Sequence, residues 1–268
     1  MQAHTAGKWL GAVLFVLFVL PAGAFAAGAD NPVPAIALII DDLGNQRLPG
    51  KHAVLLPGPV ACAFLPEGPF TRELARAAHA RDKEVMLHLP MQASGPLQNT
   101  HGAGVLTLDM TRQQYLTTLE RDLSAIPHVS GLNNHMGSLL TRHPGNMGWL
   151  MQALRERGNL FFIDSRTTRA TVARRMAYEF GIPSSERNVF LDNEPEAPAI
   201  RQQFQRLLAI ARRDGTALAI GHPYPATIEV LKEELQQLGR SGVRLVPVAQ
   251  LIELQKDRQL AWQTSLSR

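Results

Sequence analysis

Two adjacent carboxylates, Asp41 and Asp42, directly follow the apolar run AIALII at residues 35–40. Two like charges at the end of a buried strand repel each other and lose hydration. They therefore need a cation, strong hydrogen-bond donors or a proton kept on one carboxyl. An isolated acidic pair can equally cap the next helix or orient a loop. Whether the pair belongs to a site depends on what the rest of the chain brings to it.

Further polar residues stand at the ends of other apolar runs. They are His88, Asn133, Asn134, His135, Asp164, Asp192 and His222. Taken singly, a histidine or aspartate in such a place is more often a hydrogen-bonded structural residue, a helix N-cap or a turn former. Their coincidence favours a shared site, because the carboxyl ends of parallel strands converge on one face. Carboxylates and imidazoles together suit zinc or another divalent transition metal with an open position.

Motifs for competing chemistries fail on inspection. In GNQRLPGKH, Gly44 and Gly50 are one residue too far apart for a phosphate loop, and His52 replaces the residue that would bind magnesium. The sequence contains no G-x-G-x-x-G after a strand, no G-x-S-x-G and no H-E-x-x-H. Nucleotide chemistry and serine-hydrolase chemistry are therefore disfavoured.

Short β-rich apolar runs alternate with amphipathic stretches of helical length. The predicted strands are residues 35–40, 60–65, 84–89, 129–134, 160–164, 188–192, 216–221 and 243–248. The predicted helices lie near residues 70–81, 111–124, 146–157, 170–180, 198–213 and 226–239. This alternation predicts an α/β fold with a parallel sheet and crossover helices. Seven to eight parallel strands favour a closed or partly closed (β/α) barrel over an open doubly wound sheet.

The N-terminus has the pattern of a signal peptide. Lys8 precedes an apolar run of about a dozen residues, and Ala24-Phe25-Ala26 fits an A-x-A cleavage site. A retained membrane anchor is the alternative, but the run falls short of the roughly 20 apolar residues that a spanning helix needs. We expect export to the periplasm or beyond, cleavage near Ala26, and no stable membrane span after processing.

The chain divides into few segments. We predict a signal peptide at residues 1–26, a short linker at 27–34, a single barrel domain at 35–255 and a polar tail at 256–268. The Gly-rich, polar segment 91–106 is predicted to be a long loop that borders a site or is disordered.

Composition narrows the possible partners. The formal net charge is +4, a mild excess that does not argue for nucleic acid. Arg174-Arg175 and Arg212-Arg213 lie on helical stretches, where solvated faces are the default interpretation. The single cysteine, Cys62, excludes an intramolecular disulfide and a cysteine-based zinc site, and we expect it to be a small buried hydrophobe.

The residues at the strand ends resemble the motifs of the divergent polysaccharide deacetylase family, a branch related to the NodB-type carbohydrate deacetylases. Spread over residues 35–253, the matching segments are IALIIDDLG, VMLHLPMQ, GLNNHMGS, FFIDSRT, NVFLDN and AIGHPYP. Their order and spacing are those of the family. The resemblance implies a distorted (β/α) barrel, in agreement with the predicted strand count.

The resemblance also implies roles for individual residues. In NodB-type enzymes the first motif supplies a base aspartate followed by a metal-binding aspartate, which fall on Asp41 and Asp42. His88 matches the first histidine of the H-x-x-x-H motif, whereas Gln92 stands in place of the second metal-binding histidine. His222 matches the histidine of the last motif, which implies the general acid.

The remaining site residues depart further from the family pattern. We predict His135 as the third metal ligand, because it is the nearest unassigned imidazole at the same end of the barrel. The usual arginine and proline of the middle motif are replaced within Asn134–Ser138. Residues predicted to orient the ligands or the substrate are Asn134, Asp164, Arg166 and Asp192.

The resemblance implies a metal-dependent hydrolase that removes acetyl groups from the N-acetylated amino sugars of an envelope polysaccharide. The signal-peptide pattern predicts that it is exported, and the carboxylate and imidazole ligands favour zinc. A second hypothesis is an envelope carbohydrate-binding or regulatory protein that keeps the barrel and has lost turnover. The missing second histidine and the replaced middle motif support it. A third is a metal-dependent hydrolase of another amide on the same scaffold.

Overall fold

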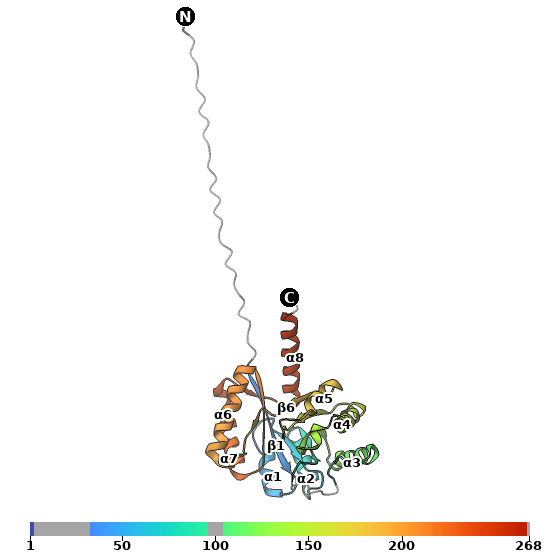
Figure 1. Ribbon diagram of the computed structural model, residues 1–268. Coiled ribbons are helices and arrows are strands. Elements are labelled where there is room, and N and C mark those ends of the chain that lie inside the picture. Colours follow the sequence, from blue (N-terminus) through green and yellow to red (C-terminus); the bar gives the residue numbers. More distant parts are fainter. Residues whose placement is uncertain (3–32, 96–103, 267–268) are drawn as a thin grey trace. The chain divides into compact units, whose positions relative to one another are not determined.

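The computed structural model describes residues 1–2, 33–95 and 104–266 (Figure 1). The predicted signal peptide and most of the linker lie outside these residues, as does the middle of the predicted loop at 91–106. No helix within the described ranges is long and apolar enough to cross a membrane.

One curled sheet forms the centre of the fold. Its strands in the described residues are β1 (Ala35–Leu43), β2 (Ala61–Phe64), β3 (Val85–Met91), β4 (Val129–Met136), β5 (Phe161–Asp164), β6 (Ser184–Glu186), β7 (Val189–Phe190), β8 (Thr216–Gly221) and β9 (Arg244–Leu245). The spatial order is β6-β5-β4-β3-β2-β1-β8-β7, with β9 beside the start of β1. Every pair is parallel, so all the strands direct their carboxyl ends to the same side.

Helices follow most of the strands, and all but the last of those described cover the outer surface of this sheet. They are α1 (Arg47–Val54), α2 (Thr71–His79), α3 (Arg112–Ala125), α4 (Pro144–Arg157), α5 (Ala173–Glu179), α6 (Ala197–Asp214), α7 (Pro225–Gln237) and α8 (Val248–Leu266), with 3₁₀ turns η2 (Leu140–Arg142) and η3 (Leu238–Ser241). In Figure 1, α6 and α7 lie on one side of the sheet and α3, α4 and α5 lie on the other. The segment predicted as a polar tail from residue 256 is the second part of α8.

A single extended segment joins the two edges of the sheet. β6 pairs with β5, and β7 pairs with β8 after only Arg187 and Asn188. At this change of partner, the Asn188 side-chain oxygen accepts a hydrogen bond from the Leu218 backbone N–H at 2.8 Å, and the Asn188 N–H donates to the Leu218 carbonyl at 2.9 Å. The side chain thus replaces one link of the strand ladder. Counted as one segment, β6 and β7 bring the total to eight, which confirms the predicted distorted barrel.

Alternate residues of the strands separate the core into two layers. Ile36, Leu38 and Ile40 of β1 point outward and pack with residues of the helices. The strand residues that point inward form a second cluster, whose members include Ala35, Ala37, Ile39, Met86, Ile163, Leu218 and Ile220. Val248, Leu251 and Ile252 of α8 belong to this inner cluster. The first turns of α8 therefore fill the barrel at the amino-terminal end of its strands.

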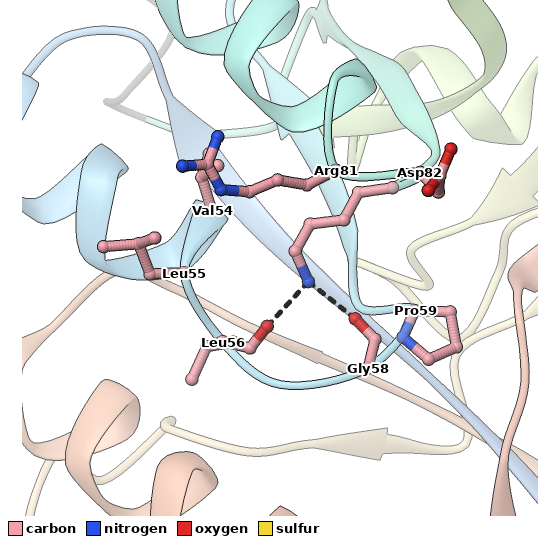
Figure 2. A pocket seen from close by; sticks show the side chains of 8 residues that line it. Val54, Leu55, Leu56, Gly58, Pro59, Arg81 and Asp82 are labelled. Atoms are coloured by element: carbon pink, nitrogen blue, oxygen red, sulfur yellow. Dashed lines mark hydrogen bonds between the residues drawn. The ribbon is translucent and has the colours of Figure 1, made fainter.

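A buried lysine fixes a loop at this same amino-terminal end. Lys83 lies two residues before the start of β3, and only 5% of it is exposed. Its ammonium donates hydrogen bonds to the carbonyl oxygens of Leu56 at 2.8 Å and Gly58 at 2.6 Å, as Figure 2 shows. Burial lowers the pKa of Lys83. Because the ammonium is already bonded to two backbone carbonyls, we assign Lys83 the role of holding the loop before β2 in place.

Candidate metal centre

A bulge in β1 brings the two adjacent carboxylates to one side. Neighbouring residues of a regular strand point to opposite faces. Here the β1–β2 register shifts between Ile40 and Leu43, and Asp42 has a left-handed backbone with φ 56°. Asp41 keeps the inward direction of Ile39, and the turned backbone directs Asp42 to the same mouth of the barrel. The local distortion thus answers why two carboxylates follow one another: both reach the same site.

Three predicted metal ligands come together at this mouth. One oxygen of Asp42, Oδ1, lies 3.0 Å from His135 Nδ1 and 3.2 Å from His88 Nε2, and the two imidazole nitrogens are 3.0 Å apart. Donor atoms around a tetrahedral zinc ion, at roughly 2.0–2.1 Å from it, are about 3.3 Å from one another. Asp42 Oδ1 is buried, and apart from the two imidazoles no group of the described residues bonds to it. The spacing of the three donor atoms fits a divalent metal held by these side chains.

Asn133 is a site residue to which the sequence assigned no role. Its side-chain N–H₂ donates to both oxygens of Asp41, at 2.8 and 3.0 Å, and to Ser165 Oγ at 3.2 Å. Its carbonyl oxygen lies 2.9 Å from His88 Nδ1. An oxygen at this position requires a proton on Nδ1, so in the neutral form of His88, the form that binds a metal, the lone pair of Nε2 faces Asp42 and His135. Asn133 therefore sets the tautomer of a predicted ligand.

The charges of the site shift one another's pKa values. Burial alone would raise the pKa of Asp42, but the imidazoles of His135 and His88 outweigh it and hold that pKa well below its usual range. Burial alone would lower the pKa of His88, but the carboxylates of Asp41 and Asp42 raise it to about 9. For Asp41 burial dominates, so its pKa is raised despite His88 and the Asn133 amide.

His222 approaches from the far side of the site with its own partner. Its Nδ1 lies 2.9 Å from one oxygen of Asp192, and its backbone N–H donates to the other oxygen at 2.6 Å. Thr227 Oγ1 also donates to Asp192, at 2.8 Å. This leaves Nε2 of His222 facing the site, 3.8 Å from Asp42 Oδ2. Burial opposes protonation of His222, but Asp192 raises its pKa.

The other predicted site residues lie nearby without touching the three ligands. Asp164 points outward, and its carboxylate accepts hydrogen bonds from Thr171 Oγ1 at 2.8 Å and from the backbone N–H groups of Arg166 and Arg174. Asn134 is also turned away and links the backbone of Met136 to that of Ser165. Their contacts hold the loops around the mouth.

Gln92, at the position of the missing histidine, serves the neighbouring loop. Its side-chain oxygen accepts a hydrogen bond from the Leu108 N–H at 2.8 Å, and its backbone N–H and C=O bond Leu106 and the Leu139–Leu140 turn. His135 occupies the ligand position beside His88 instead. The centre thus draws its second imidazole from β4 and not from the end of β3.

The carboxylates and imidazoles of this site gather at the carboxyl-terminal mouth of a distorted parallel barrel. By its fold and site, the chain is thus a (β/α) barrel protein with a candidate metal centre. A model of the divergent polysaccharide deacetylase family matches residues 38–252. The chain therefore belongs to the divergent polysaccharide deacetylase family. It is 38% identical over 221 residues to the uncharacterized protein YibQ of Escherichia coli, covering 80% of this chain and 68% of that one. An uncharacterized protein of Haemophilus influenzae is 35% identical over 203 residues, covering 76% and 71%.

Solved structures share the fold at lower identity. An uncharacterized protein from Agrobacterium tumefaciens superposes with a TM-score of 0.78 at 21% identity, over 81% of this chain and 89% of that chain. A mutant of the peptidoglycan deacetylase PdaC from Bacillus subtilis superposes with a TM-score of 0.54 at 12% identity, over 88% and 98%. These similarities establish the deacetylase-type barrel for this chain.

Proposed function

We propose that this protein is an exported metal-dependent hydrolase that removes acetyl groups from N-acetylated amino sugars of an envelope polysaccharide. The observation that carries the proposal is the convergence of Asp42, His88 and His135 within 3.0–3.2 Å, with Asp41 and His222 beside them. Membership of the divergent polysaccharide deacetylase family supports the substrate class.

Each residue has a distinct task in this mechanism. Asp42, His88 and His135 would hold a divalent ion, zinc by preference, which polarises the acetamide carbonyl and activates water. Asp41 would accept a proton from the attacking water as general base. His222 would donate a proton from Nε2 to the departing amine, while Asp192 holds its Nδ1.

The export of the protein is proposed on the N-terminal sequence alone. The short apolar run and the Ala24-Phe25-Ala26 site are typical of a cleaved signal peptide. Mass spectrometry of the N-terminus of protein recovered from cells tests this directly. A chain that begins near Ala27 supports export, and an intact Met1 in an envelope fraction means a retained anchor.

Metal content and acetate release test the activity together. We expect the purified chain to bind about one zinc ion and to release acetate from N-acetylated oligosaccharides. His135→Ala should lose both, whereas His79→Ala, an exposed histidine stacked on His128, should lose neither. Absence of metal after reconstitution would remove the hydrolase mechanism and favour a carbohydrate-binding protein. Metal binding without acetate release would direct the search to other amides.

A further inference from the structure

A cavity lined by arginines lies on the outer side of the turn that follows β5. It has a volume of about 480 Å³, and Gln259 of α8 also lines it. The side chains that line it and bear on the argument are Arg166, Arg169, Arg174, Arg175, Tyr178 and Glu186. Four guanidinium groups in one small cavity repel one another, so the carboxylates around them decide whether their charge is already neutralised.

The carboxylates of the cavity do not balance these charges. A single oxygen of Glu186, Oε1, pairs with Arg166 at 3.3 Å and with Arg174 at 3.0 Å. Asp164 supplies the second carboxylate of the lining. Four guanidinium groups face two carboxylates, so the cavity keeps an excess of positive charge.

Two of the arginines are available to a ligand. Arg175 approaches only Glu179, at 3.9 Å, and 63% of its side chain is exposed. Arg169 is exposed and makes no hydrogen bond or ion pair with any residue in the described ranges. A guanidinium presents paired N–H groups that match the two oxygens of a carboxylate or phosphate. These two side chains can therefore bind an anion without breaking an existing ion pair.

An exposed aromatic ring completes the cavity. Tyr178 of α5 lines it and is 70% exposed. An aromatic ring of this kind has an apolar face and a polar tip, a combination suited to a sugar that presents both carbon and hydroxyl surfaces. Guanidinium groups beside an exposed tyrosine thus suit a sugar that carries a negative charge.

The turn at residues 164–166 contacts both the metal centre and the cavity. Ser165 Oγ accepts a hydrogen bond from the Asn133 side chain at 3.2 Å, on the side of the metal centre. Its neighbours Asp164 and Arg166 line the cavity. Arg187 fixes this turn from beneath, because it donates to the carbonyls of Ser165 at 2.7 Å and Arg166 at 3.0 Å. The turn therefore connects the metal centre, which its Ser165 faces, with the cavity, which Asp164 and Arg166 line.

We propose that the cavity binds a carboxylate or phosphate group carried by the glycan, on a sugar near the one that is deacetylated. The substrate class is then an acidic N-acetylated oligosaccharide, an inference that rests on the proposed function. The cavity in Figure 2 provides a contrast, since its Lys83 is already bonded to two carbonyl oxygens and its lining holds two basic side chains and one carboxylate, Asp82. That cavity, at the other end of the strands, has no comparable excess of charge.

Binding of matched glycans tests the proposal. The ligands are an N-acetylated oligosaccharide with a uronic acid, the same compound with its carboxyl groups reduced to alcohols, and a phosphorylated form. Calorimetry with the zinc-loaded wild-type protein should give about tenfold tighter binding of an acidic form than of the reduced one, and high salt should weaken this preference. Comparison of the two acidic forms identifies the preferred anion.

Variants locate the preference within the protein. The double variant Arg169→Ala, Arg175→Ala should bind the reduced glycan as the wild type does and lose the preference for the acidic forms. Arg206→Ala, which removes an exposed arginine of α6, should keep that preference. Equal binding of acidic and reduced glycans by the wild type, no binding of either, or an unchanged preference in the double variant would each overturn the proposal.

Acetate release separates this inference from the proposed function. If no glycan is deacetylated but the acidic preference exists and disappears in the double variant, the catalytic proposal fails and the anion site stands. If neutral and acidic glycans are deacetylated and bound equally well, the catalytic proposal stands and the anion site fails.

Discussion

Buried charged side chains have different bonding partners at the two ends of the barrel. At the amino-terminal end, Lys83 donates to two backbone carbonyls, and Glu84 accepts the N–H groups of Val248 and Ala249 at 2.5 and 2.9 Å. At the carboxyl-terminal end, the charged side chains face one another, and apart from the imidazoles of His88 and His135 no group of the described residues bonds to Asp42 Oδ1. Charges that bond to backbone groups stabilise the fold. Charged side chains that bond only to one another leave donor atoms for a ligand.

Backbone strain follows the same division. Left-handed residues before strands at the amino-terminal end are Asp82, His128 and Asn159, which are types that tolerate this conformation. At the carboxyl-terminal end, Met136 and Arg166 adopt it as well, with φ of 54° and 51°. Methionine and arginine are rarely left-handed, at a cost of about 1–2 kcal/mol each. The mouth of the barrel therefore carries the less favourable backbone conformations.

The largest effects are expected from the paired aspartates. Asp42→Asn should lower metal occupancy, because an amide is a poorer ligand than a carboxylate, whereas Asp41→Asn should keep the metal and slow turnover. Loss of a general base lowers a rate by about a hundredfold to ten-thousandfold. Metal analysis and acetate release for both variants measure this, with thermal unfolding as the check on folding. Full activity and full metal content in both would reduce the pair to a structural turn, and the opposite pattern would reverse the two roles.

A smaller loss is expected from the partner of His222. Asp192→Asn removes the charge that holds His222 Nδ1 and should slow acetate release by about ten- to a hundredfold with unchanged metal content. Asp122→Asn makes the same chemical change in α3, away from the mouth, and should leave the rate unaltered. Equal rates in the two variants would show that Asp192 does not position a reacting group.

At the opposite end, the expected effect is on stability and not on turnover. Lys83→Met leaves the buried carbonyls of Leu56 and Gly58 without their donor, and should lower the free energy of unfolding by about 1–3 kcal/mol. Arg81→Met, at an exposed neighbouring position, should change it by less than about 0.5 kcal/mol. Denaturant titration and acetate release, measured on the same samples, compare the two ends. A variant of Lys83 that keeps full stability but loses activity would contradict the division.

The smallest expected effect is on the pH dependence of stability and concerns Asp122, a buried carboxylate of α3. Burial raises the pKa of Asp122 to about 6, whereas an unfolded aspartate has a pKa of about 3.9. Between these values the unfolded chain holds fewer protons than the folded one, so this residue lowers stability as the pH rises from about 4 to about 6. Asp122→Asn should abolish that decrease, so the variant should be more stable than the wild type at pH 7 by more than at pH 4. Unfolding titrations at pH 4 and pH 7 measure it, and parallel pH profiles for both proteins would contradict it.

Much of the fold follows from the apolar runs, because strands buried on both faces are nearly continuous hydrophobic segments. Each predicted strand overlaps an observed one, although β1, β3 and β4 extend two or three residues beyond their predicted ends, and the predicted helices coincide with α2 to α7. The sequence did not predict β6, whose residues Ser184–Glu186 are polar, or α1, which contains Pro49 and Gly50. The sequence also did not predict α8, because only the first turns of this helix contribute apolar residues to the inner cluster.

The candidate site was predictable in position more than in geometry. The ends of parallel strands placed Asp42, His88, His135 and His222 together, and the structure brings them within contact. A strand that is apolar on both faces does not reveal which residues point inward, so the outward direction of Asp164 could not be inferred. The bulge that turns Asp42 is likewise a backbone feature without a sequence signature here.

The position of β1 between β2 and β8 has a consequence for folding. Its partner residues in β8 follow it in the sequence by about 180 positions, and β9 is more distant still. Contacts between such distant segments form slowly, since a long loop must close before any of them is made. The edge of β1 that pairs with β8 therefore stays unpaired until most of the chain has been synthesised. We expect slow folding, with a nascent chain whose exposed first strand needs protection from aggregation.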